Sequence, residues 1–192
     1  MGCEKILSDG VVQLRAFRES DAEAMYHNWA NDPEVTRYLS WEPHRDVEES
    51  RELVTRWAAE GLAIDTPTWA IVLEEPIEGV PFYPDDPIGS IGIVALDAAH
   101  ETPEIGYCIG RPWWHRGVMS RALALVVEDC FERRGAQRVE AAHDVDNPRS
   151  GLVMQRCGMA RTSEECELRN GRAYLRYGIT RARWEAVRGG LG

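Results

Sequence analysis

Two spacings of apolar residues divide the chain into predicted strands and helices. Apolar-rich segments of strand length cover residues 11–17, 68–73, 88–96, 104–109 and 138–142, and two more flank Asn170-Gly171, a dipeptide typical of tight hairpin turns. Apolar residues at i, i+3 and i+4 predict helices after Ser20, over 47–60, from Met119 onward and after Asn147. This mixture of strands and helices predicts an α/β (α+β) fold.

The ends of the predicted helices carry local signals. Ser20-Asp21-Ala22-Glu23 has the pattern of a capping box, and Asn31-Asp32-Pro33 ends the first helix. Asn147 is expected to cap the helix that follows it, with Pro148 at the first position and Gly158 just beyond the end. The helix from Met119 should bury one face, formed by Met119, Ala122, Leu123, Val126, Val127, Cys130 and Phe131.

The stretch from Glu104 to Ser120 joins a predicted strand to a predicted helix through a short turn. The first N–H groups of a helix have no partner within that helix and the helix dipole is positive there, so such a turn can hold a phosphate. Gly117 would let the backbone approach a bulky anion closely. An ordinary surface turn is the alternative, because short glycine motifs are weak signals.

Residues 74–87 interrupt the pattern. This segment holds four prolines, which cannot donate hydrogen bonds to a sheet ladder, so we expect a long irregular loop between two strands. The sequence leaves three interpretations open: a mobile flap, an oligomer contact and a neutral insertion.

Composition limits the class of protein. A chain of 192 residues with 44% apolar residues can form one domain with a sizeable core. We expect a cytoplasmic protein, because no apolar run reaches the roughly 18 residues of a membrane helix and the N-terminus lacks the features of a signal peptide. The absence of a CxxC pair favours reduced, mostly buried thiols for the five cysteines, Cys3, Cys108, Cys130, Cys157 and Cys166.

Charge indicates the kind of partner. The 32 acidic and 22 basic residues give a formal net charge of −10, which argues against nucleic-acid binding and favours cationic substrates. The five histidines show no metal-ligand spacing, so we expect no metal. A thiol nucleophile at Cys108, with His115 or His143, is disfavoured because cysteines on buried strands are usually inert.

Several short motifs occur in an order that is typical of one superfamily. They are Glu-Ile-Gly-Tyr at 104–107, Trp-His-Arg-Gly-Val-Met-Ser at 114–120, Asn147 with Ser150, and Cys-Gly-Met at 157–159. Asn-Asp-Pro-Glu-Val at 31–35 and Asn-Gly-Arg at 170–172 extend the set over most of the chain. On these motifs the chain resembles the GCN5-related N-acetyltransferases (the GNAT superfamily), in particular their RimJ/RimL-like branch of ribosomal-protein N-terminal acetyltransferases.

The resemblance implies a single GNAT-like domain over residues 1–192, with 74–87 as a proline-rich loop insertion. The implied fold is a central mixed, mostly antiparallel sheet flanked by helices. Its fourth and fifth strands would splay into a V at a bulge, for which Gly106 is suited. Acetyl-CoA would lie in the splay as cosubstrate, with its pyrophosphate on the start of the following helix. The cofactor-binding residues so implied are Ile105, Tyr107, Ile109, Trp114, His115, Arg116, Gly117, Val118, Met119, Ser120, Arg121 and Asn147.

The implied activity is direct transfer of an acetyl group from acetyl-CoA to a primary amine, either a protein N-terminus or a small molecule. Glu104 would deprotonate the attacking ammonium and Ser150 would assist the departing thiolate, because Met154 stands where many relatives carry a tyrosine acid. The simpler alternatives are an exposed strand-end carboxylate for Glu104 and helix capping alone for Asn147 and Ser150.

In the resembled family two helices wall the acceptor site, and the segment between them holds Tyr38, Trp41 and His44 here. Packing or surface exposure is the alternative for these three side chains. The expected partners are acetyl-CoA and an amine acceptor, without nucleic acid or membrane, and a homodimer is left open. A non-catalytic acyl-CoA-binding sensor or partner-binding module on the same fold is the alternative function.

Overall fold

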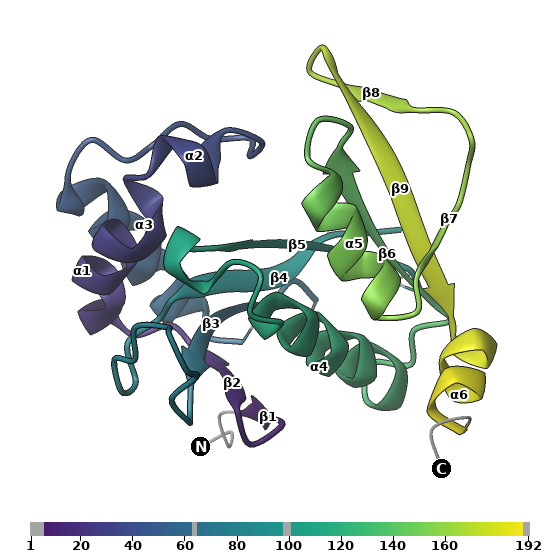
Figure 1. The fold of residues 1–192 in the computed structure, drawn as a ribbon, viewed down its shortest axis with the longest axis horizontal. Helices are drawn as coiled ribbons and strands as arrows, with labels where there is room; N and C mark the ends of the chain where they lie inside the picture. Colours follow the sequence, from purple (N-terminus) through teal and green to yellow (C-terminus); the bar gives the residue numbers. More distant parts are fainter. Residues whose placement is uncertain (1–5, 63–64, 98–100, 190–192) are drawn as a thin grey trace.

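The computed structural model describes residues 6–62, 65–97 and 101–189, and nine strands of this part of the chain form one sheet (Figure 1). Their order is β1-β2-β3-β4-β5-β6-β9-β7, with β8 paired to β9. Every strand pair is antiparallel except β5 with β6, which confirms the predicted mixed, mostly antiparallel sheet. The strands are β1 (Leu7–Ser8), β2 (Val12–Ala16), β3 (Thr68–Leu73), β4 (Gly89–Leu96), β5 (Pro103–Ile109), β6 (Arg138–Asp144), β7 (Ala160–Arg161), β8 (Glu167–Arg169) and β9 (Arg172–Thr180).

Helices pack on both faces of the sheet. Because side chains alternate along a strand, Ala70 of β3 faces a smaller core while its neighbours Trp69 and Ile71 face a larger one. The smaller core is closed by the helices near the N-terminus and the larger one by α4 and α5. The helices are α1 (Ala22–Met25), α2 (Pro33–Thr36), α3 (Val47–Glu60), α4 (Val118–Glu132), α5 (Pro148–Arg156) and α6 (Arg181–Gly189), with short 3-10 or π turns at Glu19–Asp21, Tyr26–Ala30 and Arg111–Trp113.

Most predicted elements are confirmed. Helix α3 has the predicted bounds, and all seven residues of the predicted apolar face of α4 are buried. Asn170 and Gly171 both have positive φ angles, 49° and 78°, as a type I′ hairpin turn between β8 and β9 requires. Within the described residues, no helix is both long and apolar enough to span a bilayer.

The predicted splay lies between β5 and β6, which are the fourth and fifth of the predicted strands. These strands pair only at Glu104 with Glu140 and at Ile105 with Ala141, and then diverge (Figure 1). The rest of β5 pairs with β4 on one edge and has no partner in β6 on the other. This divergence confirms the V-shaped gap.

The prediction of a bulge at Gly106 is wrong. The register shift lies in β4, between Ile93 and Ala95, so Val94 is the extra residue, and Gly106 is regularly paired with Gly92. A Cβ atom on Gly106 would come within 2.7 Å of Val94 Cγ1. Gly106 therefore makes room for the bulged valine instead of forming the bulge itself.

The predicted capping box at Ser20 is also wrong. The carboxylate of Asp21 accepts a hydrogen bond from the Arg18 N–H at 2.8 Å, so the N-cap is Arg18, two residues before Ser20. The same carboxylate accepts two bonds from the guanidinium of Arg15, at 2.8 and 2.9 Å, and both side chains are buried. A buried ion pair, rather than a surface cap, therefore fixes the first helix to β2. The short helix α2, with Asp32 as its N-cap, was not predicted.

Residues 74–87 form an irregular loop, as predicted, and this loop is attached to the domain. Arg15 donates to the Asp85 carboxylate at 3.1 Å and to the Asp85 carbonyl at 2.6 Å. The indole of Trp113 donates to the Pro81 carbonyl at 2.9 Å. Three side chains of the loop pack on the larger core, namely Ile77, Val80 and Phe82. These contacts do not support a mobile flap.

Candidate active site

A cavity of about 480 Å³ opens where β5 and β6 diverge. Its walls come from α2, the end of β5, the start of α4 and the first turns of α5. Most of the predicted site residues line this cavity: Tyr38, Tyr107, Ile109, Trp114, His115, Gly117, Val118, Met119, Ser120, Asn147 and Ser150. The structure thus brings together motifs that are far apart in the chain.

The N-terminus of α4 forms one wall of the cavity. Gly117 occupies its N-cap with a left-handed φ of 77°, and the first helical hydrogen bond runs from the Arg121 N–H to the Gly117 carbonyl at 3.1 Å. The N–H groups between these two residues therefore have no partner within the helix. The preceding turn is held by Trp114, whose indole donates to the Ile109 carbonyl at 2.8 Å. The result is a fixed main-chain site for an anion.

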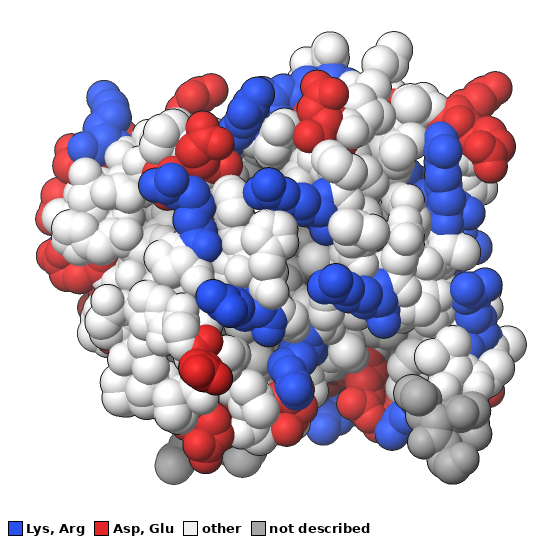
Figure 2. Space-filling view, in the orientation of Figure 1, with Lys and Arg blue, Asp and Glu red and all other residues white. Residues whose placement is uncertain are grey.

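Unpaired arginines surround this wall, although the protein is acidic overall. Arg37, Arg149 and Arg156 line the cavity, and Arg116 precedes Gly117; none of the four has a carboxylate partner among the described residues. Figure 2 shows basic side chains spread over the centre of this face, with acidic ones mainly toward its edges. Such an arrangement favours a ligand with several negative charges.

Ser150 and Tyr107 meet inside the cavity. The Tyr107 hydroxyl lies 2.9 Å from Ser150 Oγ and 3.1 Å from the Ser150 carbonyl oxygen. Burial raises the pKa of Tyr107 above its usual value, so its hydroxyl stays protonated at neutral pH. Asn147 stands at the N-cap of α5, but its side chain makes no capping hydrogen bond. The alternative that the Asn147 side chain serves only as a cap is therefore wrong, and Asn147 lines the cavity.

Comparison with known proteins identifies the family. The family model for the acetyltransferase (GNAT) domain matches residues 12–160. The uncharacterized N-acetyltransferase YoaA of Bacillus subtilis (strain 168) is 31% identical over 153 residues, which cover 80% of this chain and 81% of that protein. The chain belongs to the GNAT acetyltransferase family. A second relative, the uncharacterized N-acetyltransferase p20 of Bacillus licheniformis, is 28% identical over 159 residues, covering 80% and 84% of the two chains.

The fold also matches solved GNAT structures. RimL, a ribosomal α-N-protein acetyltransferase solved in complex with coenzyme A, superposes with a TM-score of 0.75 at 20% sequence identity, over 92% of this chain and 98% of that one. At this identity the match shows a common fold. It agrees with the single GNAT-like α/β domain and with the resemblance to the RimJ/RimL-like branch.

Glu104 of this GNAT domain does not line the cavity. Arg169 donates to both of its carboxylate oxygens, at 2.6 and 3.0 Å, and Arg176 donates to one at 2.9 Å. Burial would raise the pKa of Glu104, but the hydrogen bonds from the two arginines outweigh it and hold that pKa below its usual value. A carboxylate held in this way is a weak proton acceptor. The alternative of a solvated, exposed carboxylate is wrong, because only 14% of the Glu104 side chain is exposed. Its role as a general base stays a prediction.

The remaining predicted residues divide between the cavity and the packing around it. Tyr38 lines the cavity, whereas Trp41 and His44 contact each other with ring centroids 5.2 Å apart. His44 Nδ1 is also hydrogen-bonded to Ser50 Oγ at 2.8 Å, so the packing alternative describes these two side chains. Arg121 forms an ion pair with Asp9 at 2.7 Å and is less available for a phosphate than Arg116.

Cys108 lines the cavity without the features of a nucleophile. Its thiol lies 3.3 Å from Ser90 Oγ, and burial raises its pKa, so a thiolate is disfavoured. All four cysteines in the described ranges are free thiols, with Cys166 exposed, and Cys3 lies outside these ranges. Among the described side chains, no group of three His, Cys, Asp or Glu could hold a metal ion.

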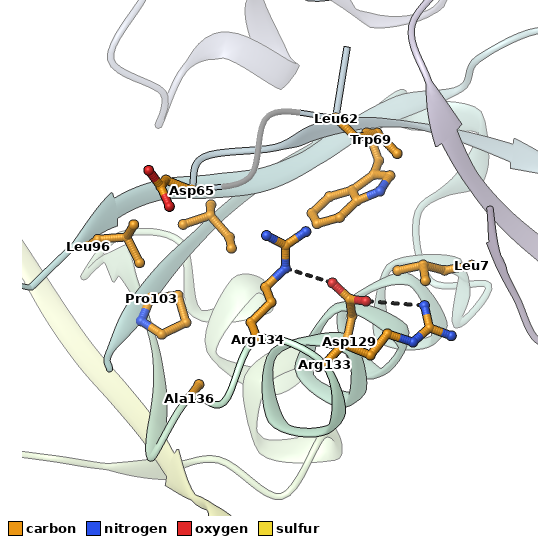
Figure 3. Close-up of a pocket in the computed structure, with 11 residues that line it drawn as sticks. Leu7, Leu62, Asp65, Trp69, Leu96, Pro103, Asp129, Arg133, Arg134 and Ala136 are labelled. Atoms are coloured by element: carbon orange, nitrogen blue, oxygen red, sulfur yellow. Dashed lines mark hydrogen bonds and ion pairs between the residues drawn. The ribbon is translucent and has the colours of Figure 1, made fainter. Parts of the chain in front are cut away.

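A second cavity, of about 440 Å³, lies near the C-terminal end of α4 (Figure 3). Its wall contains apolar side chains and Asp129, which bridges Arg133 at 3.2 Å and Arg134 at 2.7 Å. These charges are paired within the wall and no predicted site residue borders it, so the cavity at the splay is the candidate active site.

Several residues that line the candidate cavity were not predicted from the sequence. Glu34 lies on α2, an element that was not predicted, and Arg37 directly follows that helix. Arg156 lies on the last turn of α5. Arg149 could have been found, because it stands between Asn147 and Ser150 in the motif that carried the resemblance.

Proposed function

We propose that this GNAT protein transfers an acetyl group from acetyl-CoA directly to a primary amine. The observation that carries the proposal is the cavity itself, which combines the diverging strands β5 and β6 with an anion-binding helix N-terminus. The similar protein RimL has been solved with coenzyme A, which supports the same cosubstrate here. We observe nothing that favours a non-catalytic sensor.

The pyrophosphate of acetyl-CoA would bind the N–H groups that follow Gly117, with the guanidinium of Arg116 beside it. Beyond Ile105, the edge of β5 that faces β6 has unpaired backbone groups. The amides of the pantetheine arm can pair with such an edge as an added strand does. This would carry the thioester into the cavity toward Ser150.

The reaction needs a neutral amine, a polarised carbonyl and a stabilised thiolate. Ser150 lines the cavity and is proposed to donate a hydrogen bond to the departing sulfur. For Glu104, the role of general base competes with that of an anchor for the β8–β9 hairpin, which supplies both arginine partners. The arginine contacts favour the anchor.

The acceptor is proposed to be a primary amine. Glu34 and Asp146 line the cavity and form no ion pair within the described part of the chain, so either can receive an ammonium group. A protein or peptide N-terminus and a small-molecule amine both fit this chemistry.

Mass spectrometry of a cell extract incubated with the protein and acetyl-CoA should identify acetylated amines. Release of the CoA thiol should then depend on the amine so found, and calorimetry should show binding of acetyl-CoA without it. Tight binding with no amine-dependent thiol release would support the sensor alternative. Acetylation of hydroxyl or thiol groups alone would contradict the proposed acceptor class.

A further inference from the structure

Tyr107 reaches Ser150 because β5 and β6 have already separated at this point. The last parallel pair joins Ile105 to Ala141, two residues before Tyr107. The Tyr107 side chain therefore extends into the gap between the strands and meets the first turn of α5. Both Tyr107 and Ser150 line the cavity.

The Tyr107 hydroxyl has one proton and two acceptors on Ser150, the main-chain carbonyl at 3.1 Å and Oγ at 2.9 Å. When it donates to the carbonyl, the Ser150 hydroxyl can donate back to Tyr107. When it donates to Oγ instead, the Ser150 proton must point elsewhere, and the free space is the cavity. A negative charge in the cavity selects this second arrangement, since it attracts the serine proton.

Among the described residues, no other tyrosine supplies the hydrogen bond that Tyr107 makes to Ser150. Helix α5 contains no tyrosine, and Met154 on its inner face is fully buried in the core. The other tyrosine that lines the cavity, Tyr38, has no hydrogen bond to Ser150 in the described structure. Among the described residues, the phenol hydroxyl that hydrogen-bonds to Ser150 is thus that of Tyr107.

We infer that Tyr107 is a positioning residue, which directs the Ser150 hydroxyl toward the sulfur of the departing CoA. The inference rests on the proposed function. When the oxyanion of the tetrahedral intermediate re-forms the C=O bond, the C–S bond breaks and its electron pair moves to sulfur, while the extra proton on the former amine nitrogen leaves to solvent. Ser150 donates a hydrogen bond to the thiolate and Tyr107 donates one to Ser150. No net proton transfer from tyrosine is required, because a thiol is the stronger acid, with a pKa near ~8.5 against ~10.

A double-mutant cycle tests this coupling. Tyr107→Phe should lower kcat about tenfold, the effect of one hydrogen bond, with little change in the Kd of acetyl-CoA. In a Ser150→Ala background, Tyr107→Phe should lower kcat less than about twofold further, because its target is gone. Tyr177→Phe is the matched control: its hydroxyl accepts from Gln155 of α5 at 3.2 Å but lies outside the cavity lining, so kcat should not change. An equal tenfold loss in both backgrounds would overturn the inference.

A second measurement needs no acceptor and no turnover. The ultraviolet absorbance of the thiolate reports the pKa of the thiol of CoA bound to the protein. This pKa should be lower on the wild-type protein than on Tyr107→Phe or Ser150→Ala, and Tyr177→Phe should match the wild type. If the thiol of bound CoA titrates identically on all four proteins, Tyr107 does not orient Ser150 toward sulfur. Absence of amine acetylation with a normal titration shift would refute the proposed function alone.

Discussion

Single residues of the site are constrained for different physical reasons, and Gly117 is the simplest case. Its left-handed φ of 77° disfavours any side chain, while a Cβ atom there would meet nothing within 4 Å. The position is therefore limited by its backbone angle and, on the proposed function, by the phosphate that would lie beside it. Gly135, at the other end of α4, has a φ of 74° and equally open surroundings.

This pair of glycines allows a matched test of the anion site. Gly117→Glu and Gly135→Glu should each cost roughly 1–2 kcal/mol of folding stability, because both place a side chain in the left-handed region. Only Gly117→Glu should abolish binding of acetyl-CoA in calorimetry, since its carboxylate would occupy the phosphate position. Equal affinity for acetyl-CoA in the two variants would refute the placement of the pyrophosphate.

Glu104→Gln separates the two roles considered for this carboxylate. As an anchor, its loss should lower the free energy of unfolding by about 1–3 kcal/mol at neutral pH. The folded-state pKa of Glu104 is depressed, so its stabilising contribution is present above its unfolded pKa near ~4.3 and is lost as pH falls through the lower folded pKa. The difference between wild type and variant should therefore shrink in acid.

Glu165→Gln, at an exposed position without an ion pair in the described structure, is the control for these unfolding curves. If Glu104 is instead the general base, Glu104→Gln should reduce kcat by about 10²-fold or more well below the melting temperature, with recovery as pH approaches the pKa of the amine. An unchanged melting temperature combined with that rescue would rule out the anchor role.

At the scale of elements, the loop of residues 74–87 depends on a contact with a buried arginine. Asp85 has a positive φ of 67° and pairs with Arg15, which also holds Asp21 at the start of the first helix. One buried guanidinium therefore joins the loop, β2 and the helix. The loop contributes to the fold of the domain, and this structure gives it no role in covering the cavity.

Asp85→Asn should loosen the end of the loop beside Arg15, while the bond from Trp113 to Pro81 keeps the part of the loop near the cavity in place. Asparagine tolerates the positive φ, so the variant removes charge alone and should lose about 1 kcal/mol of stability. Limited proteolysis within 74–87 should become faster, while affinity for acetyl-CoA stays the same. Asp86→Asn, one residue further along, should match the wild type in both assays; a similar gain in proteolysis there would contradict the role given to Asp85.

At the scale of the whole molecule, the distribution of charge matters more than its sum. The protein has a formal net charge of −10, yet arginines without carboxylate partners gather at the cavity. Elsewhere most arginines are engaged in ion pairs, as Arg169 and Arg176 are with Glu104 and Glu167. Local unpaired charge, and not the total, determines which ligands the cavity attracts.

The salt dependence of acetyl-CoA affinity should distinguish local charge at the cavity from the total charge. Arg116→Ala should weaken acetyl-CoA binding about two- to fivefold at low ionic strength, as expected for one exposed charge pair, and the gap should close as salt screens it. Arg56→Ala removes an exposed arginine from α3, away from the cavity, and should leave the affinity unchanged. Equal losses in both variants would indicate a general charge effect.

The sequence by itself determined the features that depend on neighbours in the chain. The bounds of α3, the buried face of α4, the start of α4 at Gly117 and the Asn170-Gly171 turn all follow from periodicity, caps and turn chemistry over a few residues. The order of the motifs was enough to identify the family. These signals are local, so no knowledge of the packing is needed to read them.

Tertiary structure alone decided which of the candidate residues meet. Tyr107 and Ser150 are 43 positions apart, and Glu104 and Arg169 are 65 apart, so both contacts depend on the order of the strands. The parallel pairing of β5 with β6 places α5, which follows β6, against Tyr107. The hairpin of β8 and β9 brings its arginines onto Glu104. The sequence predicts that the Glu104 carboxylate is a base, whereas in the fold this carboxylate is ion-paired. Its protonation is set by charges that the sheet brings within hydrogen-bond distance, and no local pattern encodes them.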